Sequence, residues 1–356
     1  MYEVSIILPV YNAEKKIEKT LNSIIEQDCK IKYQIIIVND GSKDSSGNIC
    51  ERYNKIYRNI TYVKTENQGV SNARNVGLEH AKSNYVMFID SDDTYEKRMI
   101  EKMYNTIKNN EKFLVVCGYD RIYENKDYIL KINGFDFKEY LENCEKKIKL
   151  LKNNNLFNQV WNKIYDLNII KKNNILFEKN VDIGEDKVFN IKYLEKIKGI
   201  CCIEDRLYNY NYSSGGLNAK TNYNNFVSKL NNSIIEYKFY RDKLFDCEAI
   251  YREYLINILS YLIFLNKQKQ FNKENIINIA CRKRIETELL HIEKKSKIIT
   301  NKICAKILRT KKIYILRFLT KIFAMFKYIV KDNVFLKIIK RKLDDMSKER
   351  KKNDLC

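Results

Sequence analysis

The stretch YVMFIDSDD, residues 85–93, places three carboxylates directly after a strongly apolar run. The five apolar residues Tyr85–Ile89 predict a strand covered on both faces, as the strands of parallel sheets are. Asp90, Asp92 and Asp93 then surround a single serine, although their charges repel one another. Carboxylates gathered at the carboxyl end of such a strand commonly face a cation or a hydroxylated ligand. The stretch therefore predicts a parallel sheet with a polar site at its edge.

Strand and helix patterns alternate on the amino-terminal side of this stretch. Strands are expected at 4–10, 34–40, 60–65 and 85–90, and helices at 13–27, 42–57 and 69–81. Regular βαβ alternation predicts an α/β fold with helices on both faces of a mainly parallel sheet. Ligands of such sheets bind at the carboxyl ends of the strands, where Pro9–Asn12, Asp40 and Asp90–Asp93 fall.

Composition limits the classes of protein and of chemistry. The 356 residues are 45% hydrophobic and 31% charged, which is typical of a folded protein. The net charge of +21 indicates an anionic partner, namely nucleic acid, anionic lipid or a phosphorylated ligand. The two histidines, His80 and His291, are far apart in sequence, which argues against a histidine metal site or a Ser-His triad. We therefore expect carboxylates to carry the chemistry.

The ten cysteines are scattered along the chain without CxxC spacing, and the sequence enters its first strand without a signal peptide. We therefore expect reduced thiols and a cytoplasmic location.

The character of the chain changes near residue 216. Long helical patterns with asparagine- and lysine-rich connections follow, which predicts an α-helical basic extension over 216–356 after a domain over 1–215. Within the extension, residues 313–330 are strongly apolar but are interrupted by Arg317, Lys321 and Lys327 near one helical face. This pattern favours an amphipathic helix on the inner face of the cell membrane over a spanning helix. A basic helix packed on its own domain is an equal alternative.

Four segments carry a family resemblance. SIILPVYNAE (5–14), IIVNDGSKDSS (36–46), ENQGVSNARNVGLEHA (66–81) and FIDSDD (88–93) each fall at a predicted strand-to-helix junction. In this order they resemble inverting family 2 glycosyltransferases of the bacterial surface-polysaccharide type. The resemblance covers about residues 4–215. It implies a GT-A (Rossmann-like) fold with a mixed, mainly parallel sheet, a nucleotide-sugar half over about 1–119 and an acceptor half over about 120–215.

The resemblance implies a pocket for a UDP-sugar, and the residue types agree with it. Asp40 can accept a hydrogen bond from a base N–H, and Arg74 can donate to base carbonyls or to phosphate. The implied nucleotide-sugar-binding set is Pro9, Tyr11, Asn12, Asp40, Asn67, Arg74, Asp90 and Ser91. Taken singly, Asp40 could instead cap a turn and Arg74 could lie on a helix surface.

The pair Asp90 and Asp92 has the spacing of a D-x-D motif. Side chains of an extended chain alternate between faces, so both carboxylates point to the same side. By resemblance, Asp90 holds the ribose hydroxyls, while Asp92 binds the Mn²⁺ or Mg²⁺ that bridges the diphosphate. We expect Asp93 to cap a helix that begins near Tyr95 rather than to support the metal through a water molecule.

A second acidic pair opens the predicted helix in VDIGEDKVFNIKYL, residues 181–194. The helix dipole alone favours acids in a first turn. By resemblance, Asp186 is the general base, with Glu185 as the alternative. The resemblance also places Trp161, Asn162 and Lys163 near the sugar and the acceptor, although Trp161 could equally be a core residue.

One segment departs from the family pattern. Many members carry arginines after the acidic pair, whereas residues 208–220 contain none. Ser213, Ser214, Gly215–Gly216 or Lys220 would then contact the diphosphate.

The leading hypothesis is a metal-dependent inverting transfer of a sugar to a hydroxyl of a glycan or lipid-linked acceptor in surface-polysaccharide synthesis. A nucleic-acid-binding protein is one alternative, but it does not explain the acids at strand and helix ends. A nucleotidyltransferase is another, but it would need a glycine-rich phosphate loop where PVYNAEKK (9–16) has no glycine. No pattern names the donor sugar, the acceptor or the oligomeric state.

Overall fold

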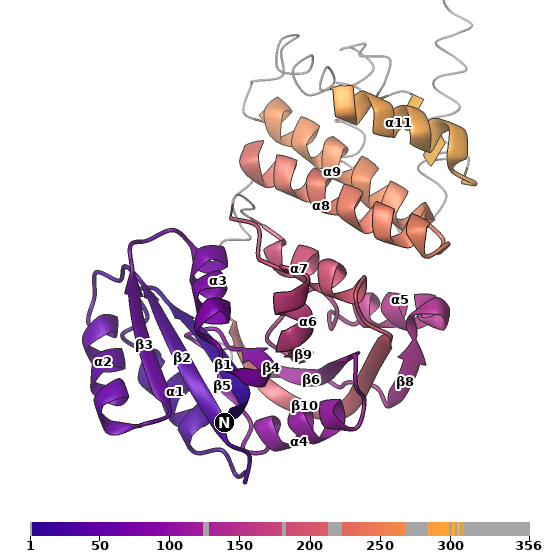
Figure 1. Cartoon of the computed structure of the whole chain (residues 1–356). Helices are drawn as coiled ribbons and strands as arrows, with labels where there is room; N and C mark the ends of the chain where they lie inside the picture. Colours follow the sequence, from indigo (N-terminus) through magenta and orange to yellow (C-terminus); the bar gives the residue numbers. More distant parts are fainter. Residues whose placement is uncertain are drawn as a thin grey trace, which may run out of the picture. The chain divides into compact units, whose positions relative to one another are not determined.

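The computed structural model describes residues 2–123, 128–179, 183–212, 223–267 and 283–298, together with 301, 302, 305, 306 and 308. The chain divides into two compact units, 1–220 with 242–245 and 221–241 with 246–356 (Figure 1). The predicted domain boundary at residue 215 falls in 213–222, which lie outside the described residues.

The first unit is built on a ten-stranded sheet, in which eight strands follow the order β3-β2-β1-β4-β9-β6-β10-β5 and two more, β7 and β8, pair off this path. Its parallel part consists of β1 (Tyr2–Val10), β2 (Tyr33–Asp40), β3 (Ile60–Thr65) and β4 (Ser83–Phe88). Residues Val86–Ile89 are fully buried, and so are Ile35–Val38 in the neighbouring β2. Burial on both faces explains why these strands are almost continuously apolar.

The other part of the sheet mixes strand directions. β9 (Lys163–Asp166) runs antiparallel to both β4 and β6 (Phe113–Tyr123), whereas β10 (Gly199–Tyr212) runs parallel to β6. Three short strands pair antiparallel at its margins: β5 (Thr94–Tyr95) and β8 (Phe137–Tyr140) with β10, and β7 (Tyr128–Ile132) with β6. The predicted mixed sheet is confirmed.

Helices flank this sheet, as Figure 1 shows. They are α1 (Ile17–Ile25), α2 (Ser46–Ile56), α3 (Val70–His80), α4 (Met99–Lys108), α5 (Glu145–Asn153), α6 (Leu167–Lys172) and α7 (Glu185–Leu194), with a short 3₁₀ turn at Leu141–Asn143. α3 lies directly on β1, because a Cβ atom at Gly77 would come within 2.4 Å of Ile7 Cγ2. This close approach sets the distance between α3 and the face of the sheet.

The described part of the second unit is helical, as predicted, with α8 (Tyr223–Asp242), α9 (Glu248–Lys267) and α11 (Lys283–Lys295). Its own core includes Phe226, Ile234, Tyr254, Ile258 and Leu289. Among the helices with described residues, none has the length and apolarity needed to cross a bilayer. The predicted amphipathic segment 313–330 lies outside the described residues.

Candidate active site

The acidic turn after β4 is tied to β10 through Asp93. This carboxylate is fully buried and accepts hydrogen bonds from Tyr208 Oη at 2.6 Å and from the backbone N–H of Asn211 at 2.7 Å. Burial, and then the charges of Asp90 and Asp92, raise the pKa of Asp93 well above its ordinary value. The predicted cap role of Asp93 is wrong, because Thr94–Tyr95 is a strand and α4 begins only at Met99. Asp93 instead anchors the turn from beneath.

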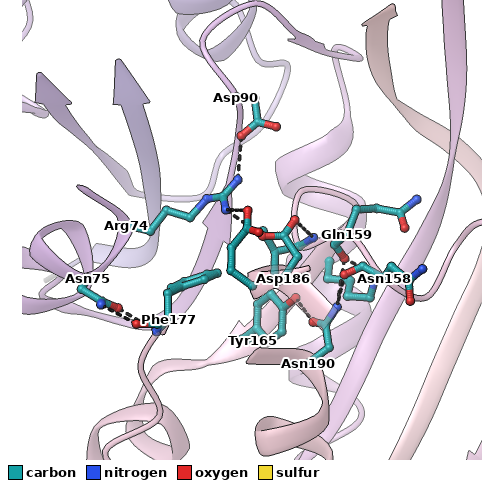
Figure 2. A network of polar contacts seen from close by, with 12 residues as sticks. Arg74, Asn75, Asp90, Asn158, Gln159, Tyr165, Phe177, Asp186 and Asn190 are labelled. Atoms are coloured by element: carbon teal, nitrogen blue, oxygen red, sulfur yellow. Dashed lines mark hydrogen bonds and ion pairs between the residues drawn. The ribbon is translucent and has the colours of Figure 1, made fainter. Parts of the chain in front are cut away.

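Arg74, on α3, joins the acidic turn to the second acidic pair. Its guanidinium contacts Asp90 Oδ1 at 3.0 Å, Asp186 Oδ1 at 2.7 Å and Glu185 Oε1 at 3.4 Å (Figure 2). Burial alone would lower the pKa of Arg74, but the charges of Asp186, Asp90 and Glu185 raise it. The guanidinium also lies 5.2 Å from the ring centre of Phe177. One buried cation therefore holds together three carboxylates from two distant segments.

Asp186 lies in the first turn of α7, and its side chain is 18% exposed. The preceding Gly184 has a φ of 85°, a left-handed conformation that glycine adopts without strain. The second oxygen of Asp186, Oδ2, accepts the backbone N–H of Val160 at 3.3 Å. Burial raises the pKa of Asp186 to about 7, although Arg74 pulls it down and the charges of Glu185 and Asp90 push it up. A carboxyl group with such a pKa can exchange a proton near neutral pH.

The segment that supplies Val160 is held from inside the protein by Asn190. This residue lies one helical turn after Asp186, and its amide donates to the backbone carbonyls of Phe157, Asn158 and Gln159 at 2.9, 2.8 and 3.2 Å. Its oxygen accepts the hydroxyl of Tyr165 at 2.6 Å (Figure 2). The position of the Val160 N–H therefore depends on a buried polar network.

Lys163 supports the same segment. Its ammonium nitrogen lies 2.8 Å from the carbonyl oxygen of Leu156, 2.6 Å from that of Gln159 and 2.7 Å from Asn162 Oδ1. Complete burial lowers the pKa of Lys163 to about 7, and Asp186 opposes that shift. Three acceptors match the three N–H groups of an ammonium, which favours the charged form.

The predicted acceptor-side residues therefore lie beneath the site. Trp161 is 6% exposed and stacks on Tyr208 with ring centres 4.2 Å apart, while Asn162 and Lys163 are fully buried. No local sequence pattern predicted this supporting role, because Lys163 is simply the first residue of the short strand β9.

The predicted nucleotide-side residues lie along the carboxyl edge of the parallel strands. Asp40 is buried and accepts the backbone N–H groups of Gln68 and Gly69 at 2.9 and 2.8 Å, so it shapes the loop that leads into α3. Asn12 accepts the N–H of Lys43 at 2.8 Å.

The other predicted nucleotide-side residues differ in exposure. Tyr11 is 46% exposed and Asn67 is exposed, whereas Ser91 and Asp92 are half-buried and Pro9 is buried in β1.

Asn75 ties α3 to the segment before α7. Its amide nitrogen donates to the carbonyl oxygen of Phe177, and its amide oxygen accepts the N–H of the same residue, both at 2.9 Å (Figure 2). Phe177 in turn stacks on Phe189 of α7, with ring centres 4.1 Å apart. These contacts thus fix the position of Glu185 and Asp186 relative to Arg74. No local sequence pattern predicted this contact.

Comparison with known proteins gives matches at three levels. Residues 5–173 match the family model described as "Glycosyl transferase family 2". The chain is 31% identical over 226 residues to "Glycosyltransferase GlyA" of Streptococcus pneumoniae, covering 60% of this chain and 31% of that protein. It is 29% identical over 216 residues to "Poly(ribitol-phosphate) beta-N-acetylglucosaminyltransferase TarS" of Staphylococcus aureus, covering 59% of this chain and 35% of that protein. The chain thus spans about a third of the length of these two relatives.

A crystal structure of S. aureus TarS residues 1–349 with UDP-GlcNAc superposes with a TM-score of 0.64 at 20% identity. The superposition covers 93% of this chain and 94% of that one, which shows a shared fold. The family model covers the parallel strands, the acidic turn and Lys163. Residues 5–173 thus match glycosyl transferase family 2, and the fold of the chain agrees with that match.

Proposed function

We propose that the chain is a metal-dependent inverting glycosyltransferase that moves a sugar from a UDP-sugar to a hydroxyl of a surface-glycan acceptor. The observation that carries this proposal is the ion-pair cluster in which Arg74 brings Asp90 and Asp186 onto one guanidinium. It joins an acidic turn suited to a ribose and a diphosphate to a carboxyl group that can take a proton near pH 7.

The proposed roles follow from exposure and contacts. Asp186 Oδ1 and Oδ2 are held by Arg74 and Val160, which fix the carboxylate as it accepts the proton of the acceptor hydroxyl. The acceptor oxygen then attacks the anomeric carbon in line with the departing diphosphate, so the configuration inverts. Exposed Tyr11 and Asn67 at the strand edge are suited to the base and the ribose.

The residues present fit a metal ion that binds together with its diphosphate. Within the described residues, no three His, Cys, Asp or Glu side chains form a metal-binding group. Mg²⁺ in phosphate-handling sites is commonly held by one or two carboxylates plus the substrate oxygens. Half-buried Asp92 supplies one such carboxylate, close to the carboxylate of Asp90 in the same turn. Mn²⁺ or Mg²⁺ bound there would neutralise charge on the leaving diphosphate.

The donor and acceptor classes are taken from the relatives. The TarS structure contains UDP-GlcNAc, and the TarS name specifies poly(ribitol-phosphate) as the chain that is glycosylated. We therefore choose UDP-GlcNAc as the first donor to test and a sugar or polyol-phosphate chain as the first acceptor. Cytoplasmic location and membrane contact through 313–330 stay predictions.

UDP binding should depend on both Asp92 and a divalent cation. In calorimetric titrations, we expect Mn²⁺ to strengthen UDP binding to the wild-type chain and to have little effect on Asp92→Asn. The reason is that the cation needs the carboxylate as well as the diphosphate oxygens. Equal UDP affinity with and without Mn²⁺ in both proteins would contradict metal-assisted departure at Asp92.

The transfer rate should rise with pH between about 6 and 8, with a midpoint near 7. The general base works only when it is deprotonated, and burial raises the pKa of Asp186 to about 7. The charge of Arg74 opposes this rise in the pKa of Asp186, whereas the charges of Glu185 and Asp90 add to it. The measurement is kcat/KM for UDP-GlcNAc across this range at constant ionic strength. A flat profile would show that Asp186 does not limit the reaction.

A further inference from the structure

One face of the sheet carries an aromatic surface that starts at the acidic turn. β6 and β10 run side by side, and their register pairs Tyr119 with Tyr208 (Figure 1). Residues paired across strands point to the same side of a sheet. Both tyrosines are buried, and Trp161 covers Tyr208. The hydroxyl of Tyr208 contacts Asp93 at 2.6 Å, so this inner end of the surface is part of the support of the acidic turn.

The next position along the same face is Arg121, which is paired with Tyr210. Its guanidinium carbon lies 6.0, 5.7 and 5.9 Å from the ring centres of Tyr119, Tyr210 and Tyr212. Its Nη2 also donates to the hydroxyl of Tyr119 at 3.2 Å. Cation–π contacts of this kind hold rings in fixed orientations. Arg121 therefore stiffens the tyrosines around it.

The outer row of this face is made of three tyrosines on three neighbouring strands. Tyr123 of β6 is paired with Tyr212 of β10 and with Tyr128 of β7. The ring centres are 5.0 Å apart for Tyr123–Tyr212 and 5.7 Å apart for Tyr123–Tyr128. Tyr128 is 53% exposed and Tyr212 is 40% exposed. We call Tyr128, Tyr123 and Tyr212 the tyrosine row.

The tyrosine row has the chemistry of a carbohydrate platform. A tyrosine ring offers an apolar face to the C–H groups of a sugar or polyol, and its hydroxyl offers a hydrogen bond. Rings that are already fixed lose little entropy when a ligand binds. The row begins at Tyr212, next to Asn211, whose backbone N–H donates to Asp93 at 2.7 Å. It extends across two strand spacings, or about 10 Å, to Tyr128, so its outer end is separated from the acidic turn.

We propose that the tyrosine row is an acceptor subsite that binds a sugar or polyol unit of the acceptor chain remote from the reacting hydroxyl. This proposal rests on the proposed function. The occupant is inferred from the continuity of this face with the acidic turn and from the match between fixed rings and sugar units. A chain acceptor bound there presents its other units toward the turn, whereas a single unit is too short to reach both places.

The test is binding of chain probes, read from the fluorescence of Trp161, the only tryptophan. The probes are a ribitol-phosphate octamer and an N-acetylglucosamine hexamer, each compared with its monomer. We expect Tyr128→Ala combined with Tyr212→Ala to weaken binding of at least one chain about tenfold or more. Monomer binding and UDP binding should be unchanged. The matched control is Tyr140→Ala on β8, where another tyrosine is 50% exposed.

Four outcomes would overturn the proposal. The first is that the wild-type protein binds neither chain, and the second is that the double variant binds both chains as tightly as wild type. The third is that the double variant loses affinity for UDP. The fourth is that the double variant loses self-association while its chain binding is unchanged. The third would make the row a nucleotide contact, and the fourth would make it an interface between copies. Both substituted rings are exposed and lie at strand ends, so melting temperatures should confirm folding. The Asp92 titration with UDP tests the proposed function separately.

Discussion

Replacing Asp186 by asparagine is expected to lower the rate of sugar transfer by about 10²–10⁴-fold, the usual contribution of a general base. The asparagine keeps the size of the side chain, and its oxygen can still accept from Arg74, but it cannot take a proton from an acceptor hydroxyl. The measurement is kcat for transfer from UDP-GlcNAc, together with the affinity for UDP. Because Asp186 acts on the acceptor, UDP affinity should stay close to that of wild type.

The matched control for this substitution is Asp205→Asn, which removes a surface carboxylate paired with Lys102. Asp205 is 43% exposed in its side chain, and we expect no change in the transfer rate. Glu185→Gln separates the two acids, since Glu185 is the alternative base. A rate lost in Glu185→Gln and kept in Asp186→Asn would reverse the assignment of the two residues.

Replacing Arg74 by methionine is expected to lower the free energy of unfolding by about 3–5 kcal/mol, as removal of one partner from a buried ion pair does. Arg74 is the cation that pairs with Asp90, Glu185 and Asp186. Without its guanidinium, the three carboxylates would repel one another. Urea unfolding at pH 7.5 measures the change. Arg52→Met is the control, because Arg52 pairs with Glu18 on the surface and such pairs contribute about 0–1 kcal/mol.

The Arg74 deficit should shrink as the pH falls. Loss of the cation raises the pKa of Asp186 further above its unfolded value, because the Arg74 charge is what opposes the effect of burial. A carboxyl group with a raised folded-state pKa favours folding at low pH and loses that contribution as the pH rises through the folded value. A deficit that is constant between pH 5 and 8, or no larger than that of Arg52→Met, would contradict this account.

Much of the fold could be predicted because its signals are local. Buried parallel strands are apolar at nearly every position, so β1, β2 and β4 are visible in the sequence as short apolar runs. Each run ends in polar residues at the same edge of the sheet, which brought Asp40 and the acidic turn together in the prediction. Asp186 at the start of a helix was equally local.

The contacts that complete the site could not be predicted from such signals. Arg74 and Asp186 are separated by 112 residues, and only the packing of α3 against the segment before α7 brings them together. Asp93 was assigned to a helix cap because a short strand, β5, interrupts what was expected to be helix. Buried Lys163 donates to the backbone carbonyls of Leu156 and Gln159 and to the side-chain oxygen of Asn162. The direction in which a backbone carbonyl points cannot be read from a sequence.

Arg74 also limits how this chain can be recombined with its relatives. Its counter-ions are Asp90 in the acidic turn and Glu185 and Asp186 at the start of α7. The charge of Arg74 is therefore balanced only when both segments are present. A chimaera that takes the residues beyond about 120 from a relative needs acidic residues at the positions that contact Arg74. Without them, the guanidinium of Arg74 would be buried with too few counter-ions. Substitutions at exposed positions such as Tyr128 and Tyr212 lie outside that constraint.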